Sequence, residues 1–239
     1  YNGTEPTPQY LSTSFTVDFN LYKYRTLNIG ASAFDRLRGG NHGLTTSSSN
    51  AEGDISGSST AQILAKQFER NDGFSVGTGA NNAAPLVAYS FKRAPGFMDV
   101  VAYTGDGVAG RTVSHNLGVV PELMIVKSRS SAEDWLVYHK ELNINGDSRP
   151  ETDYIFLNGA ANGGDEASVW NDTSPTDSVF TVGTNSGTNG STKTYIAYLF
   201  STLAGVSKVG KYIGTGTTLS VDCGFSTGAR FILIKRQGT

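Results

Sequence analysis

The chain has little cysteine and little net charge. Its one cysteine, Cys223, excludes a disulfide framework within the chain. It lies in the apolar-flanked run Val-Asp-Cys-Gly-Phe, where we expect a small buried side chain. Nineteen Lys and Arg face 21 Asp and Glu, and the net charge of −2 offers no basic surface for nucleic acid or an anionic membrane. No apolar run approaches the ~18 residues of a membrane span, so we expect no membrane insertion.

Long amphipathic helical patterns are also missing. A parallel βαβ fold needs a crossover of about a dozen residues or more, usually a helix, and only Ile63–Phe68 has helical spacing, enough for one turn. The 29 Gly and the many Thr, Ser, Phe and Tyr favour short strands and turns instead. We therefore predict an all-β protein of antiparallel, sandwich-like domains.

The sequence repeats itself at long range. Tyr103 matches Tyr212 and Lys127 matches Lys235, at offsets of 109 and 108 residues. This period is longer than the ~20 to 50 residues of a solenoid unit and equals about one small domain. Four stretches match in order: Phe74–Gly79 with Phe180–Asn185, Leu86–Phe91 with Tyr195–Phe200, Gly96–Gly107 with Gly205–Gly216, and Leu123–Arg129 with Phe231–Arg236.

The repeat predicts a domain organisation. We expect an N-terminal arm and leading strand over 1–26, a divergent first β-repeat over 27–107 and a second over 108–216. Residues 217–239 are then the start of a third, truncated repeat. Leu86–Phe91 and its counterpart are almost wholly apolar, which predicts strands covered on both faces. The serine-rich stretch Thr45–Thr60 and the Gly- and Asn-rich stretches 158–165 and 184–193 predict loops.

Catalytic and cofactor motifs are weak. Gly105–Gly110 matches G-x-G-x-x-G, but a strand and turn pattern follows it where a dinucleotide site needs a helix, so we interpret it as a turn. No G-x-S-x-G elbow occurs, and the acids that could cleave glycosides, among them Glu133, Asp134, Glu151 and Asp153, have unknown separations. We predict no catalytic residue, no cofactor and no enzyme activity.

No dedicated metal motif is evident either. His42, His115 and His139 lie far apart, and hydrogen bonds to nearby backbone are expected of them instead. Asn162–Glu166 could supply calcium with loop oxygens, but it lacks the alternating acids and closing glutamate of a dedicated loop. We therefore predict no metal site.

Aromatic side chains could serve adhesion. For Trp135 and Tyr138, in an apolar strand pattern, we expect core positions. Trp170 begins a turn, and an exposed indole there would make a platform for a sugar or a protein partner. The predicted adhesion surface consists of Trp170, Asn171, Asn162, Asp165, Asn185 and Asn189.

Several segments resemble a known family. They are Arg111–Arg129, Trp135–His139, Trp170–Thr176, Phe180–Thr184 and Tyr195–Lys211, with Asp35–Gly40 and Ala94–Gly105 similar to a divergent leading copy. Together they look like a repeat domain of unassigned function found in tail fibre and tail structural proteins of tailed bacteriophages. The resemblance carries over no catalytic or ligand residues.

The resemblance implies a virion structural protein, a tail fibre or baseplate-attached fibre that is assembled in the bacterial host cytoplasm. Its expected partners are other tail or baseplate proteins, a host cell-surface glycan or protein, and further copies of itself in a trimer. Three alternatives stay open: a carbohydrate-binding module of a receptor-binding protein, a polysaccharide depolymerase and a head-decoration fibre.

Overall fold

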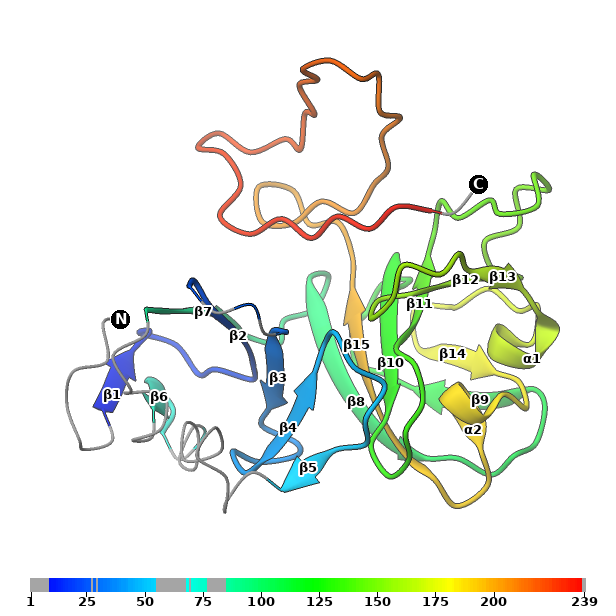
Figure 1. The fold of residues 1–239 in the computed structure, drawn as a ribbon, viewed down its shortest axis with the longest axis horizontal. Coiled ribbons are helices and arrows are strands. Elements are labelled where there is room, and N and C mark those ends of the chain that lie inside the picture. Colours follow the sequence, from blue (N-terminus) through cyan, green and yellow to red (C-terminus); the bar gives the residue numbers. More distant parts are fainter. Residues whose placement is uncertain are drawn as a thin grey trace. The chain divides into compact units, whose positions relative to one another are not determined.

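A computed structural model describes residues 9–26, 28, 30–54, 68, 70–76 and 85–237 (Figure 1). Nearly all of its regular structure is antiparallel β-sheet, which confirms the all-β prediction. The chain forms two compact units. The first comprises Tyr1–Arg93 with Ser128–Asp134, and the second comprises Ala94–Lys127 with Trp135–Thr239.

The second unit contains a six-stranded sheet, a two-stranded ribbon and two short helices. The sheet has the order β13-β12-β11-β10-β15-β8, and β9 pairs with β14 to form the ribbon. In chain order the elements are β8 (Met98–Thr104), β9 (Arg111–Ser114), β10 (Leu123–Ser128), β11 (Leu136–His139), β12 (Asp153–Phe156), β13 (Gly164–Asp165), α1 (Ala167–Trp170), β14 (Val179–Val182), α2 (Ser186–Asn189) and β15 (Thr194–Phe200).

The core of the second unit lies between the sheet and the ribbon. Strand β15 lies between β10 and β8, and Tyr195 to Leu199 are at most 2% exposed, so the prediction of a strand covered on both faces is confirmed for β15. It is wrong for its counterpart Leu86–Phe91, which is only partly buried after Leu86. Phe180 of the ribbon meets Tyr103 edge to face, with ring centroids 5.9 Å apart. Trp170 of α1 completes this apolar cluster. Such burial is the main driving force for folding of a unit with so little helix.

The first unit has a five-stranded sheet and its own ribbon. The sheet has the order β5-β4-β3-β2-β7, and β1 pairs with β6. Its core again joins sheet residues to ribbon residues. The strands are β1 (Gln9–Ser12), β2 (Phe19–Tyr24), β3 (Ser32–Asp35), β4 (His42–Thr45), β5 (Gly53–Asp54), β6 (Gly73–Val76) and β7 (Leu86–Phe91).

The two units share one topology. The order β5-β4-β3-β2-β7 corresponds strand for strand to β13-β12-β11-β10-β15, and the ribbon β1-β6 corresponds to β9-β14. The registers agree too. Phe19 lies opposite Asp35 in the first unit, and Leu123 lies opposite His139 in the second, both 104 residues later. Among the described residues, β8 has no counterpart in the first unit.

The shared topology extends the repeat toward the N-terminus. Asp18-Phe-Asn-Leu-Tyr-Lys-Tyr-Arg25 is equivalent to Glu122-Leu-Met-Ile-Val-Lys-Ser-Arg129, because β2 and β10 occupy the same place in their sheets. The first of these segments was predicted to form an arm and leading strand. The compact units do not divide at 26/27 or 107/108: β2 belongs to the first sheet, and β8 pairs with β15 along its whole length. The division into sequence repeats stays a prediction.

Residues 208–237, which include 217–237 of the predicted third copy, contain no strand, and Figure 1 draws them as an orange to red trace without arrows. The repeat's turns are nonetheless kept. The bridge Leu203–Ser207 matches Ala94–Met98, and the αL glycine Gly224 (φ 71°) matches Gly118 (φ 73°). Several large apolar side chains here are more than two fifths exposed: Tyr212, Ile213, Leu219, Val221, Ile232, Leu233 and Ile234.

Some local expectations need correction. Cys223 is only partly buried, whereas its repeat equivalent Leu117 is fully buried, because the segment around Cys223 pairs with no strand in the described structure. The predicted loops 158–165 and 184–193 contain β13 and α2. Within Thr45–Thr60, strand β5 forms and residues 55–60 lie outside the described residues. The helical turn Ile63–Phe68 also lies outside them, apart from Phe68.

The core position of β15 gives a stability prediction. Leu199→Ala removes a fully buried side chain and should lower the free energy of unfolding by about 2 to 5 kcal/mol in urea denaturation. Val206→Ala, at a side chain 55% exposed, is the matched control and should change it by less than about 0.5 kcal/mol. Equal effects of the two variants would contradict the placement of β15 in the core.

Candidate functional site

The predicted adhesion surface is not a single exposed patch. Trp170 is 1% exposed, its indole Nε1 donates to the backbone oxygen of Asp153 at 3.0 Å, and its ring meets Tyr138 edge to face. A buried indole cannot stack on a sugar, so the platform interpretation of Trp170 is wrong. The predicted core positions of Trp135 and Tyr138 are confirmed, at 1% and 4% exposure.

Two of the predicted asparagines organise backbone. Asn189 is fully buried, and its amide nitrogen donates to Asp106 Oδ1, Val108 O and Gly183 O at 2.8 to 3.1 Å. Asn185 caps α2 by accepting from the Gly187 amide at 2.8 Å. Both side chains therefore hold loops in place and offer little to a ligand.

The other three predicted residues lie nearer the surface. Asn171 ends α1 in the left-handed conformation (φ 56°) and is partly buried. Asn162 and Asp165 are exposed, and Asp165 accepts a hydrogen bond from the side chain of Asn145. Of the six predicted residues, Trp170 and Asn189 are buried, Asn171 and Asn185 are partly buried, and Asn162 and Asp165 are exposed.

The other sequence candidates have structural roles. Gly105–Gly110 forms the loop before β9, a strand, so its interpretation as a turn is confirmed. His115 Nε2 lies 3.2 Å from Thr176 O and His139 Nδ1 accepts from the Glu141 amide, as expected for local hydrogen bonds. Within the described residues no group of three His, Cys, Asp or Glu side chains is placed to hold a metal ion, and no helix there is long and apolar enough to span a membrane.

Glu122, which was not among the predicted site residues, links β10 to β15 in the second unit's sheet. The Glu122 amide donates to Phe200 O at 2.9 Å, which ties the start of β10 to the end of β15. Its Oε2 accepts from the Thr202 amide at 3.0 Å, and its Oε1 contacts Lys140 Nζ at 2.8 Å. Burial raises the pKa of Glu122, but the hydrogen bonds from Lys140 and Thr202 outweigh this and hold it below the ordinary glutamate value.

The first unit repeats this arrangement with an aspartate. The Asp18 amide donates to Phe91 O at 2.9 Å, and Asp18 Oδ2 accepts from the Arg93 amide at 2.9 Å. Asp18 Oδ1 lies 3.7 Å from Arg36 Nε, in the position that Lys140 takes in the second unit. The sequence signal was an acid five residues before the lysine of a repeated strand.

The first unit also contains a buried ion network. Arg38, whose side chain is fully buried, bonds to Asp35 and to Glu52 Oε1 at 3.0 Å, and Arg129 reaches Glu52 Oε2 at 2.9 Å. Burial raises the pKa of Glu52, but both arginines lower it, with a net decrease. Each charge has a fixed partner, so this network offers no free reactive group, and removing one partner would leave a buried charge unpaired.

An acidic pair stands out at the edge of the second sheet. Asp153 of β12 lies opposite Asp165 of β13, and Asp153 is fully buried. Burial is the first cause that raises the pKa of Asp153, and Asp165, Asp147 and Glu151 raise it further, against the lowering effect of a hydrogen bond from Ile144.

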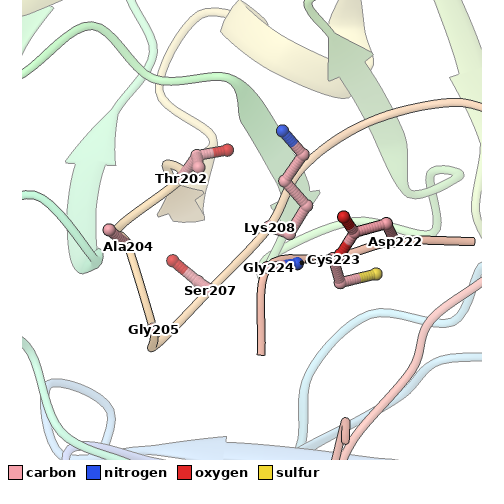
Figure 2. Close-up of a pocket in the computed structure, with 8 residues that line it drawn as sticks. All are labelled: Thr202, Ala204, Gly205, Ser207, Lys208, Asp222, Cys223 and Gly224. Atoms are coloured by element: carbon pink, nitrogen blue, oxygen red, sulfur yellow. Dashed lines mark hydrogen bonds between the residues drawn. The ribbon is translucent and has the colours of Figure 1, made fainter. Parts of the chain in front are cut away.

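A shallow hollow of about 300 Å³ lies beside the C-terminal segment. Figure 2 shows it between the turn after β15, with Ala204, Gly205 and Ser207, and the turn around Cys223. Its lining residues are mostly small, and Lys208 and Asp222 are its charged residues. It lacks the large apolar and aromatic side chains that line most small-molecule sites.

Comparison with known proteins identifies the family. The model of a family described as Domain of unknown function (DUF7483) matches residues 1–239, so the chain belongs to that family. Neither the search of curated proteins nor the search of solved structures found a match. The family description assigns no function, and functional inference therefore rests on the chain itself.

The Glu122 carboxylate should contribute measurably to stability. Glu122→Gln should lower the free energy of unfolding by about 1 to 2 kcal/mol at neutral pH, because it removes charge-assisted hydrogen bonds from a partly buried site. The folded pKa of Glu122 is depressed, so its contribution is present above its unfolded pKa and is lost as the pH falls through the folded value.

The measurement is urea denaturation of both proteins over a pH series. The difference between them should shrink in acid, and Glu141→Gln should behave like the wild type throughout. A difference that persists unchanged below the folded pKa of Glu122 would show that its charge is not responsible.

Proposed function

We propose that this chain is a structural protein of a tailed-bacteriophage virion, a tail fibre or baseplate-attached fibre that spaces and presents loops for host-surface adhesion. The observation that carries the proposal is the repeated β-module with matching registers, together with the sequence resemblance to phage tail repeat domains. A repeated module suits a spacer, because each copy adds length while keeping its own core.

The mechanism is mechanical and adhesive. In the first unit β7 pairs with β2, and in the second unit β15 pairs with β8, both antiparallel and between segments far apart in the chain. This pairing supports resistance to unfolding, because pulling out β7 or β15 breaks the sheet and exposes the core. The connections between strands carry the variable contacts, as loops on rigid scaffolds commonly do. The exposed residue Asn162 lies in such a connection, between β12 and β13, and the exposed Asp165 is the last residue of β13.

Assembly with other proteins is part of the proposal. The exposed apolar side chains of residues 208–237, among them Ile213 (82% exposed) and Ile232 (69%), favour a segment that neighbouring subunits cover in the assembled fibre. We propose a homo-oligomer, a trimer in keeping with the resemblance, which would multiply weak contacts to a host glycan or protein into avidity. The carbohydrate-module alternative loses its platform, since Trp170 is buried.

The test is the location of the protein on the virus. An antibody raised against this chain, with gold labelling of purified particles of the phage that encodes it, should mark the tail or baseplate in electron micrographs. The pre-immune serum is the control. Label on the head would instead indicate a head-decoration fibre, and absence of the chain from purified particles by mass spectrometry would overturn the proposal.

A further inference from the structure

The chain contains several Asn-Gly pairs, and asparagine is among the chemically labile residues. The backbone nitrogen of the following residue can attack the asparagine side-chain amide, and glycine, which has no Cβ, hinders that approach least. The pairs begin at Asn2, Asn145, Asn158, Asn162 and Asn189. Asn2 lies outside the described residues, and the structure gives the other four very different surroundings.

Two of these pairs are held by hydrogen bonds. Asn189 is buried with its amide nitrogen bonded to three acceptors, and the Gly190 amide donates to the Tyr195 hydroxyl at 2.7 Å. The nitrogen that would attack is therefore engaged. Asn158 Oδ1 accepts from the Trp135 amide at 2.8 Å, which fixes the side chain away from its own backbone.

A third pair is held by close packing of the backbone. Asn162 is exposed, but a Cβ built on Gly163 would collide with the carbonyl oxygen of Tyr154 in β12. The Gly163 backbone thus lies directly against the neighbouring strand. It cannot turn toward the Asn162 side chain without leaving that strand.

The pair Asn145–Gly146 is open by comparison. Both residues are exposed in the β11–β12 loop, and nothing lies within 4 Å of the place where a Gly146 Cβ would stand. Among the described residues, no hydrogen bond occupies the Gly146 amide. Asn145 Oδ1 accepts from the Asp147 amide at 3.2 Å. That donor faces the oxygen that becomes negative when Cγ is attacked, and such donors stabilise the intermediate.

We propose that Asn145–Gly146 is a self-modification site, where asparagine converts slowly to aspartate and isoaspartate with water as the only co-reactant. The Gly146 nitrogen loses its proton to hydroxide and forms a bond to Asn145 Cγ. The Cγ–Nδ2 bond then breaks, and ammonia leaves with a proton taken from water, which restores the hydroxide. Water adds to either carbonyl of the cyclic imide, and breaking that C–N bond opens the ring.

The modification changes how the loop is held. The Asn145 side-chain nitrogen contacts Asp165 Oδ2 of β13 and lies 3.3 Å from Asp147 Oδ2. In the product a carboxylate replaces this amide donor between two like charges, which repel it. The contact that ties the loop to β13 is lost, so the reaction loosens an exposed loop irreversibly. It needs only this loop and water, and it stands whether or not the chain belongs to a phage fibre.

Peptide mass spectrometry tests the proposal on the full chain. The folded protein is incubated at mildly alkaline pH, and fragment spectra locate the gain of one mass unit. Conversion at Asn145 should exceed that at Asn158, Asn162 or Asn189 at least about fivefold. In a urea-unfolded sample the four sites should convert within about twofold of one another, because the fold no longer protects three of them. Equal conversion in the folded protein, or faster conversion at Asn162, would overturn the proposal.

Variants separate the chemistry from its consequence. Gly146→Ala should slow the conversion at Asn145 at least about fivefold, since a Cβ hinders the attacking nitrogen. Asn145→Asp and Asn145→Ser both lose the amide, but only the first adds the charge of the product. Asn145→Asp should therefore lower the thermal unfolding midpoint by about 2 °C more than Asn145→Ser. An unchanged rate in Gly146→Ala would contradict the ring-closing step, and equal midpoints would contradict the loosening of the loop.

Discussion

Each unit depends on one long-range contact, between the strand that ends the unit and the strand near its beginning. In the first unit β7 pairs with β2 over six residues, and the Asp18 amide holds the last carbonyl of β7. In the second unit β15 lies between β10 and β8, and Glu122 makes the same bond to Phe200. Without this pairing neither sheet could cover its ribbon, because the apolar face is shared between early and late residues of the unit.

The Glu122 carboxylate, like that of Asp18 in the first unit, helps to hold this long-range strand pairing in place. The backbone of Glu122 binds the end of β15, and its carboxylate accepts a hydrogen bond from Thr202 in the turn that follows. The same carboxylate pairs with Lys140, which follows the adjacent strand β11. Charge-assisted hydrogen bonds from several directions are stronger than neutral ones. Asp18 and Glu122 differ by one methylene, and their cationic partners are Arg36 and Lys140, so the geometry is retained while the residues vary.

Much of the fold could be predicted from the sequence, because Phe180, the apolar strand Tyr195–Phe200 and the turn glycines recur at a nearly constant offset. The equivalence of β2 with β10 was missed, since Asn20 and Tyr22 stand where Met124 and Val126 do, and only the shared sheet position reveals it. Trp170 was misplaced for another reason: the turn residues after it constrain the backbone but leave the direction of the indole open. The meeting of Asp153 and Asp165 depends on strand register, which no short motif contains.

Two modules with one register are the central claim, and interstrand nuclear Overhauser contacts measure register most directly. The account predicts that Leu21 lies opposite Tyr89 and, by equivalence, that Ile125 lies opposite Tyr198. Backbone contacts between these pairs in isotopically labelled protein would bear out the shared architecture. A displacement of one residue in either unit would contradict it, because it would turn a buried face of that strand toward solvent.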